Sequence, residues 1–161
     1  MTSLRFVDTQ LDRPRWRSTA NLRVHRNVQL GVEYNPAAGE FAPLATCFVR
    51  TETERAPAMF LGTSSDRIGS PEGMQAYYAT AAKLLPRVPI GVYASLAYSE
   101  WDSGWNLPFG AQLDLGHGAW VRSMYDGERT HVLGGRTMGR FDASLIWAWL
   151  EEWGGSIAIG F

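Results

Sequence analysis

The chain has little cysteine and little charge. Cys47 is the single cysteine among 161 residues, so an intramolecular disulfide and a multi-cysteine zinc site are both excluded. Charged residues make up 19% of the chain and the formal net charge is −1. A basic surface of the kind that binds nucleic acid is therefore absent, and we expect no nucleic-acid partner.

Long apolar runs are missing as well. No window holds the roughly 20 consecutive apolar residues that a transmembrane helix needs. The first residues, Met1 to Arg5, contain no apolar stretch of the signal-peptide type. Taken alone, this start predicts a cytosolic protein. It also fits a mature sequence from which a signal peptide has been removed.

Recognisable catalytic motifs are absent too. The three histidines, His25, His117 and His131, show no metal-ligand spacing, and no nucleophile elbow, phosphate-binding loop or dinucleotide fingerprint occurs. We therefore expect a non-enzymatic protein without a metal site or cofactor.

Glycine and aromatic residues are plentiful, with 17 Gly and 7 Trp, as in β-proteins with tight turns. Several segments alternate apolar and small or polar residues with a period of two, which indicates β-strands with two unlike faces. The clearest are Val28 to Tyr34, Val88 to Tyr98, Leu107 to Leu115 and a closing hairpin, with a strand from Phe141 to Trp149, a turn at Glu151 to Gly155 and a last strand through Ile157 and Ile159. The glycines at 134 and 135 are interpreted as a strand flaw or a bulge.

One segment is ambiguous. Residues 71–85 follow Ser70, an N-cap residue type, and are rich in alanine, so they could form a helix. The same residues also alternate as a strand would. Because strands flank them on both sides, the strand is preferred.

The fold class predicted from this pattern is all-β: a single domain, residues 1–161, forming an antiparallel up-and-down β-barrel of about 10–12 short strands. Closure removes the exposed edges of a long meander. Short connections at His25–Asn27, Gly116–Gly118 and Gly139–Arg140 alternate with longer ones. Counting strands back from the end puts the short turns at one end of the barrel. The alternative is a soluble barrel or sandwich with residues 71–85 as a helix.

The closing segment Gly155–Phe161 resembles the terminal assembly signal of bacterial outer-membrane β-barrels, with alternating Ile157 and Ile159 before a final aromatic Phe161. A fainter resemblance is to YjbH-type barrels linked to exopolysaccharide secretion. The resemblance implies a lipid bilayer and the barrel-assembly machinery as partners, with other membrane or periplasmic subunits possible. It also implies a location in the bacterial outer membrane after removal of a signal peptide. A soluble protein stays the alternative.

The composition of the two strand faces also favours a membrane barrel over a soluble one. The face opposite the apolar one carries small and uncharged residues more than Lys or Glu, and Trp147 and Trp149 lie near a strand end, where interface aromatics are found. Charged residues on the small-residue faces are predicted to point into the lumen, where they would line a pore or form a salt-bridged plug. They are Glu33, Lys83, Asp114, Arg122 and Arg136. The predicted function is a narrow pore or a structural membrane subunit, and the alternative is a soluble barrel that binds a small apolar ligand.

Overall fold

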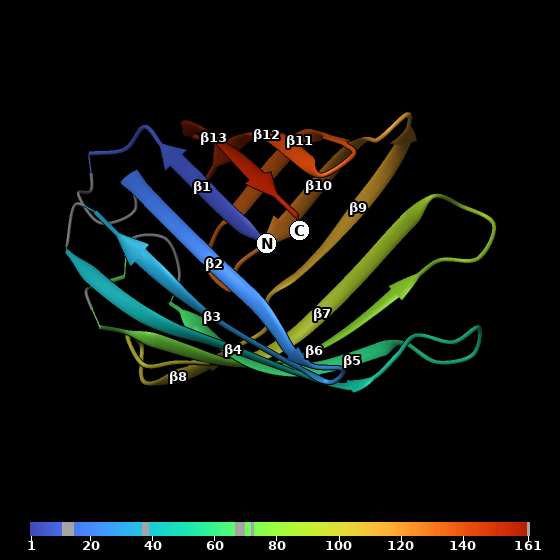
Figure 1. Ribbon diagram of the computed structural model, residues 1–161, viewed down its shortest axis with the longest axis horizontal. Helices are drawn as coiled ribbons and strands as arrows, with labels where there is room; N and C mark the ends of the chain where they lie inside the picture. The colour runs from blue at the N-terminus through green and yellow to red at the C-terminus, as the bar shows by residue number, and fades with distance from the viewer. Residues whose placement is uncertain (11–14, 37–38, 67–69, 72, 161) are drawn as a thin grey trace.

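The computed structural model describes residues 1–10, 15–36, 39–66, 70–71 and 73–160, and these residues form an all-β fold (Figure 1). The strands are β1 (Thr2–Val7), β2 (Trp16–His25), β3 (Val28–Asn35), β4 (Glu40–Arg50), β5 (Ala58–Ser65), β6 (Gln75–Leu84), β7 (Ile90–Ser99), β8 (Gly104–Asn106), β9 (Phe109–Gly116), β10 (Ala119–Tyr125), β11 (Thr130–Met138), β12 (Phe141–Ala148) and β13 (Glu152–Ile159).

Twelve of these strands close into an antiparallel barrel, which confirms the predicted fold class. Each strand pairs with its neighbours in the chain, β1 pairs with β13, and β7 pairs with both β6 and β9. The extra strand β8 lies in the connection after β7 and pairs with the last residues of that strand. It was not expected, because three residues are too few to display a period.

Residues 75–84 are strand β6, so the helix alternative for this segment is wrong. The strand pairs over residues 75–82 with β5 on one side and over residues 76–84 with β7 on the other. Alanine favours helices only weakly, by tenths of a kcal/mol per residue, and two ladders of backbone hydrogen bonds outweigh that preference.

The connections differ at the two ends of the barrel. We call the turn end the one with the connections at residues 26–27, 51–57, 85–89, 117–118 and 139–140, and the loop end the one with those at 8–15, 36–39, 66–74, 100–108, 126–129 and 149–151. All three short turns expected on one side fall at the turn end. The two ends of the chain, marked N and C in Figure 1, lie close together, as the pairing of Thr2 with Ile159 requires.

The closing hairpin turns earlier than the pattern predicted. Trp149 and Leu150 both have positive φ angles, 56° and 61°, and form the bend between β12 and β13. Trp153 and Gly154, which had been assigned to the turn, are strand residues paired with Trp147 and Ile146. Because its backbone bends here, Trp149 leaves the outer face and packs against the buried cluster at the loop end.

Gly134 and Gly135 form no bulge. Strand β11 keeps an unbroken register with both β10 and β12 through these two residues. Gly135 instead makes room for an aromatic ring, because a Cβ there would lie 2.5 Å from Cζ2 of Trp120 on the neighbouring strand. The same relation holds between Gly110 and Tyr93, where a Cβ would lie 2.7 Å from the ring.

The buried core is small and lies inside the loop end. Val7, Ile146 and Ala148 form its centre, with Leu133 and Trp149 packed against it. Buried polar residues continue the packing at this end; among them are Thr9, Asn35, Ser65, Ser99 and His131. The inner residues near the turn end, such as Arg23 and Asp114, are exposed. The interior is therefore packed at the loop end and opens toward the turn end.

Candidate functional site

The outer face of the barrel is apolar. On β12, Leu145 is 68% exposed while the next residue, Ile146, is 4% exposed, so the alternation sorts residues between an accessible outer face and a buried inner face. The exposed outer residues are large and apolar around the whole barrel; among them are Leu4, Leu22, Leu30, Val32, Leu61, Leu96, Leu113, Val121, Leu145 and Ile157. The inner face carries polar and charged residues such as Arg17, Glu33 and Arg122, together with the ring of Trp120 and the buried apolar cluster at the loop end.

Aromatic pairs surround the loop end on the outer face. Five cross-strand pairs have ring centroids 4.6 to 5.5 Å apart: Phe6–Trp16, Tyr34–Phe41, Tyr98–Trp105, Phe109–Tyr125 and Trp147–Trp153. Each pair joins directly opposed residues near the loop-end limits of their strands. We call this set the aromatic girdle. Such girdles are typical of the interface between lipid and water.

The two ends carry opposite charge among the described residues. Acidic residues prevail at the loop end, where Arg15 and Arg129 are the only basic residues in the described part. The acidic residues there are Asp8, Glu40, Asp66, Glu100, Asp102, Asp126, Glu128, Glu151 and Glu152. Basic residues prevail at the turn end, where Arg23, Arg26, Arg50, Arg55, Lys83, Arg87, Arg136 and Arg140 outnumber Glu52, Glu54, Asp114 and Asp142. The potential along the barrel axis therefore changes sign between the ends.

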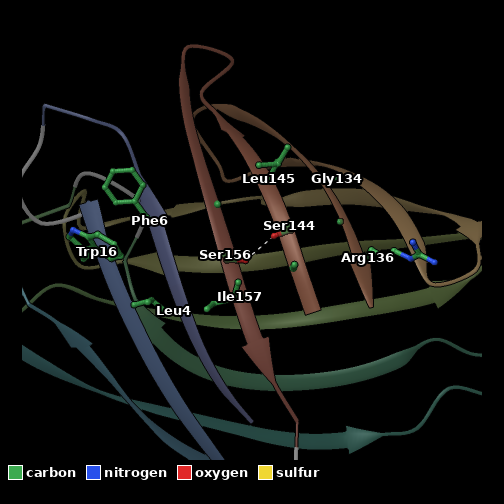
Figure 2. A pocket seen from close by; sticks show the side chains of 12 residues that line it. Leu4, Phe6, Trp16, Gly134, Arg136, Ser144, Leu145, Ser156 and Ile157 are labelled. Atoms are coloured by element: carbon green, nitrogen blue, oxygen red, sulfur yellow. Dashed lines mark hydrogen bonds between the residues drawn. The ribbon is translucent and has the colours of Figure 1, made fainter. Parts of the chain in front are cut away.

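A shallow apolar groove of about 540 Å³ runs over the outer face where β11, β12, β13 and β1 lie side by side (Figure 2). Gly134 and Gly155 form its floor because they have no side chains, and Leu145, Ile157 and Phe6 are among the residues that border it. Its one charged lining residue is Arg136. The groove belongs to the apolar exterior rather than to the lumen.

The inner face of β1 to β3 carries a charged cluster. Arg17 forms a close ion pair with Glu33, and Ser65 Oγ donates a hydrogen bond to the other carboxylate oxygen of Glu33 at 2.7 Å. Arg5 lies directly opposite Arg17 on the neighbouring strand. Neither Arg5 Nε nor Arg17 Nε has a hydrogen-bond partner among the described residues.

On the far wall of the lumen, Arg122 donates from Nε to Gln112 Oε1 at 3.0 Å, and its guanidinium lies 5.3 Å from the ring of Trp120. The indole N–H of Trp120 in turn donates to Asp142 at 3.3 Å. Arg122 thus has a neutral acceptor and a ring as neighbours, rather than a carboxylate.

A histidine and an aspartate form a hydrogen-bonded pair at the loop end. His131 Nδ1 accepts the backbone N–H of Trp149 at 3.2 Å, so the hydrogen of the neutral ring sits on Nε2, which donates to Asp126 Oδ2 at 2.9 Å. Both ring nitrogens are therefore occupied, and His131 has no free nitrogen to act as a general base. Burial by itself raises the pKa of Asp126, but the hydrogen bonds from His131 and from the backbone of Arg129 and Glu128 outweigh it and bring the pKa below its usual value.

The structure distributes the five predicted lumen residues over both faces. Glu33, Asp114 and Arg122 lie on the inner face. Asp114 and Arg122 are on the paired strands β9 and β10, whereas Glu33 is on β3 across the barrel. No ion pair joins any two of them among the described residues, and Asp114 Oδ1 instead accepts the backbone N–H of Gly116 at 2.8 Å. Lys83 and Arg136 lie on the outer face near the turn end. Lys83 is opposite Val92 and pairs with Glu52 at 3.1 Å, and Arg136 donates to the carbonyl of His117 at 3.3 Å.

Of the predicted assembly residues, Ile157 and Ile159 are exposed on the outer face of β13, and Phe161 lies outside the described residues. The residues that the sequence reasoning missed are Arg5 and Arg17. Their strands are not among the segments with the clearest alternation, although Arg17, Thr19, Asn21 and Arg23 do alternate with less polar residues.

Within the described part of the chain, no helix is long and apolar enough to cross a membrane. No group of three or more His, Cys, Asp or Glu side chains in that part could hold a metal ion.

In comparisons with known proteins, no family model, no curated protein and no solved structure matches this chain.

Proposed function

We propose that this chain spans a lipid bilayer as a closed β-barrel in the bacterial outer membrane, and that it serves there as a structural membrane subunit without enzymatic activity. The observation that carries the proposal is the exterior of the wall, where large apolar side chains are accessible around the barrel, while charged side chains such as Arg17, Glu33 and Arg122 lie inside. A closed barrel satisfies every backbone hydrogen bond internally, as a lipid environment requires.

The aromatic girdle supports the same proposal. Its five pairs follow the loop end around the barrel, at a constant position relative to the ends of the strands. Aromatic side chains concentrate where lipid headgroups meet hydrocarbon. An even number of barrel strands, three two-residue turns at the turn end and the longest connections, 66–74 and 100–108, at the loop end are in keeping with the pattern of bacterial outer-membrane barrels.

A soluble barrel with an apolar cavity is disfavoured. It would need its apolar residues inside, but the buried core is limited to a few residues at the loop end, and the inner face beyond them includes Arg17, Glu33 and Arg122. Soluble monomers rarely expose contiguous apolar surface on the scale of this wall.

The packed loop end favours a closed barrel over a steady pore. Val7 and Ala148 are fully buried, and His131 and Ser99 beside the loops are nearly so, which supports a loop end that is closed to solvent. Passage of a solute would require the cluster around Ile146 and Trp149 to move.

Refolding tests the proposal. The denatured protein is diluted into detergent micelles, and unboiled and boiled samples are compared by gel electrophoresis. We expect a faster-migrating unboiled band with β-type circular dichroism, and aggregation when detergent is omitted. A monodisperse protein in plain buffer would overturn the membrane proposal.

The closed lumen has a separate test. The refolded protein is added to planar bilayers and the current is recorded. We expect no steady conductance. A stable open channel in the wild type would show that the loop-end core does not seal the barrel, and the pore alternative would replace the structural one.

A further inference from the structure

The inner face of β1 and β2 carries three arginines. Arg17 and Arg23 are six residues apart on β2, so both face inward, and Arg5 lies opposite Arg17 on β1. The inner positions of β1, β2 and β3 contain one carboxylate, that of Glu33. This sector of the lumen therefore has a surplus of positive charge.

The one carboxylate is already engaged. Glu33 is buried and forms its ion pair with Arg17, and it accepts a hydrogen bond from Ser65 at 2.7 Å. Arg5 thus faces a second guanidinium, and no ion pair joins it to a carboxylate among the described residues. Like charges directly opposite each other on neighbouring strands destabilise a sheet, and a charge withdrawn from water is costly unless it is paired.

Hydroxyl groups extend the row of donors. Ser156 lies directly opposite Arg5 on the other side of β1, and Ser144 lies opposite Ser156. The two serine hydroxyls are hydrogen-bonded to each other at 2.8 Å (Figure 2). Four adjacent strands thus present two hydroxyls and two guanidinium groups at one level of the inner face, and both arginine Nε atoms lack a described partner.

We propose that this row binds one oxyanion, a carboxylate or a phosphate group, between Arg5 and Arg17. Guanidinium groups match the geometry of such anions, because two parallel N–H groups can donate to two oxygens. The bound anion would supply the negative charge that separates the two arginines. Glu33 would hold Arg17 in position while leaving its Nε–H available.

Access would come from the turn end. Inner residues become more exposed in that direction, and Arg23, whose guanidinium lies 4.2 Å from the ring of Phe48, is exposed there. The arginines of the connections at this end, Arg26, Arg55 and Arg87, would raise the local concentration of anions at the opening. The acidic, packed loop end would not admit them.

The test measures thermal unfolding and isothermal titration of the refolded wild-type protein with inorganic phosphate, acetate and chloride at equal ionic strength. We expect phosphate, acetate or both to raise the unfolding temperature in a saturable way, and chloride to have no such effect. The phosphate and acetate titrations distinguish a phosphate site from a carboxylate site.

Variants locate the binding. Arg5→Gln should weaken the effective anion by about tenfold or more, as expected for the loss of a charge-assisted hydrogen bond, and Arg5→Lys should retain part of the affinity. Arg136→Gln is the matched control: it removes the same charge from the outer face and should leave the titration unchanged.

Equal responses to phosphate, acetate and chloride in the wild type would overturn the proposal even if Arg5→Gln failed to fold. Equal losses in Arg5→Gln and Arg136→Gln would overturn it too, because they would indicate a general charge effect. The inference goes beyond the proposed membrane location. If the protein were monodisperse without detergent but bound phosphate at Arg5, the proposed membrane location would be refuted, and the proposed anion site would still stand.

Discussion

Trp147 and Trp153 lie directly opposite each other across the last hairpin, with their rings 5.5 Å apart and within 5° of parallel. Both side chains are on the outer face of the loop end. The stacked pair fixes the register of β12 against β13 and at the same time places two amphipathic rings in the aromatic girdle.

This contact predicts a measurable coupling. Trp147→Ala and Trp153→Ala should each destabilise the refolded barrel, and the double variant should lose less than the sum of the two, because stacked rings contribute about 0.5–1.5 kcal/mol beyond their buried area. A double-mutant cycle on the free energy of unfolding in denaturant measures the coupling free energy between the two rings. Single effects that add within about 0.3–0.5 kcal/mol would contradict the coupling.

Introducing a charged side chain on the outer face tests whether that face contacts lipid or water. Leu145 lies near the middle of β12 and is highly exposed. Facing lipid near the midplane of a bilayer, Leu145→Arg should destabilise the barrel by about 2–4 kcal/mol. On a surface facing water the same change should stay within about 0.5 kcal/mol.

Phe141→Arg is the matched variant for this comparison. Phe141 faces outward on the same strand but lies at its turn-end limit, so the added charge can reach the interface and should cost only about 0–1 kcal/mol. Unfolding in urea from lipid vesicles gives both values. Equal costs at the two positions would contradict the assignment of Leu145 to the membrane interior.

The fold was accessible to sequence reasoning because alternation is strong in most strands. Val28 to Tyr34 and the closing hairpin display their two faces directly, and both form antiparallel strands, although the turn of the hairpin comes earlier than predicted. The bend at Trp149 was hidden, because a tryptophan with positive φ gives no sign of a turn, whereas Gly116 and Gly118 do.

The charged residues show where the period of two stops being informative. In β6 both faces are small, with Ala79 and Ala81 beside Lys83 and with Ala76 and Ala82 on the other face, so composition could not assign Lys83 to the outside. Arg136 follows two glycines and suffers from the same ambiguity. Arg5 becomes notable only when pairing brings it opposite Arg17, which no local pattern reveals.

Two adjacent glycines allow a controlled test of interior packing. Gly134 and Gly135 are neighbours on β11, but a Cβ at Gly134 would meet nothing within 4 Å, while one at Gly135 would lie 2.5 Å from Cζ2 of Trp120 and 2.8 Å from the carbonyl oxygen of Ala143. Gly135→Ala should therefore destabilise the barrel by about 1–3 kcal/mol.

Gly134→Ala should be neutral or stabilising by up to about 1 kcal/mol, because alanine restricts the unfolded chain and fits the strand backbone. Chemical unfolding of the two variants in the same detergent gives the difference. Similar stability of the two variants would mean that Trp120 can leave its position over Gly135 without cost.

The last prediction concerns acid. The pKa of Asp126 is lower in the folded chain than in the unfolded one, because hydrogen bonds from His131 and two backbone N–H groups outweigh the effect of burial. Its contribution to stability is therefore complete above the unfolded pKa of about 3.9 and is lost as the pH falls through the lower folded value. The unfolding temperature of the wild type should drop more steeply between pH 5 and pH 2 than that of Asp126→Asn, in which this carboxyl no longer titrates.

Glu151→Gln is the control for this comparison. It removes an exposed acid from the same end of the barrel and should keep the wild-type slope. If the Asp126→Asn protein followed the wild-type curve throughout, the pair of Asp126 and His131 would not be what ties the loop 126–129 to the bend at Trp149.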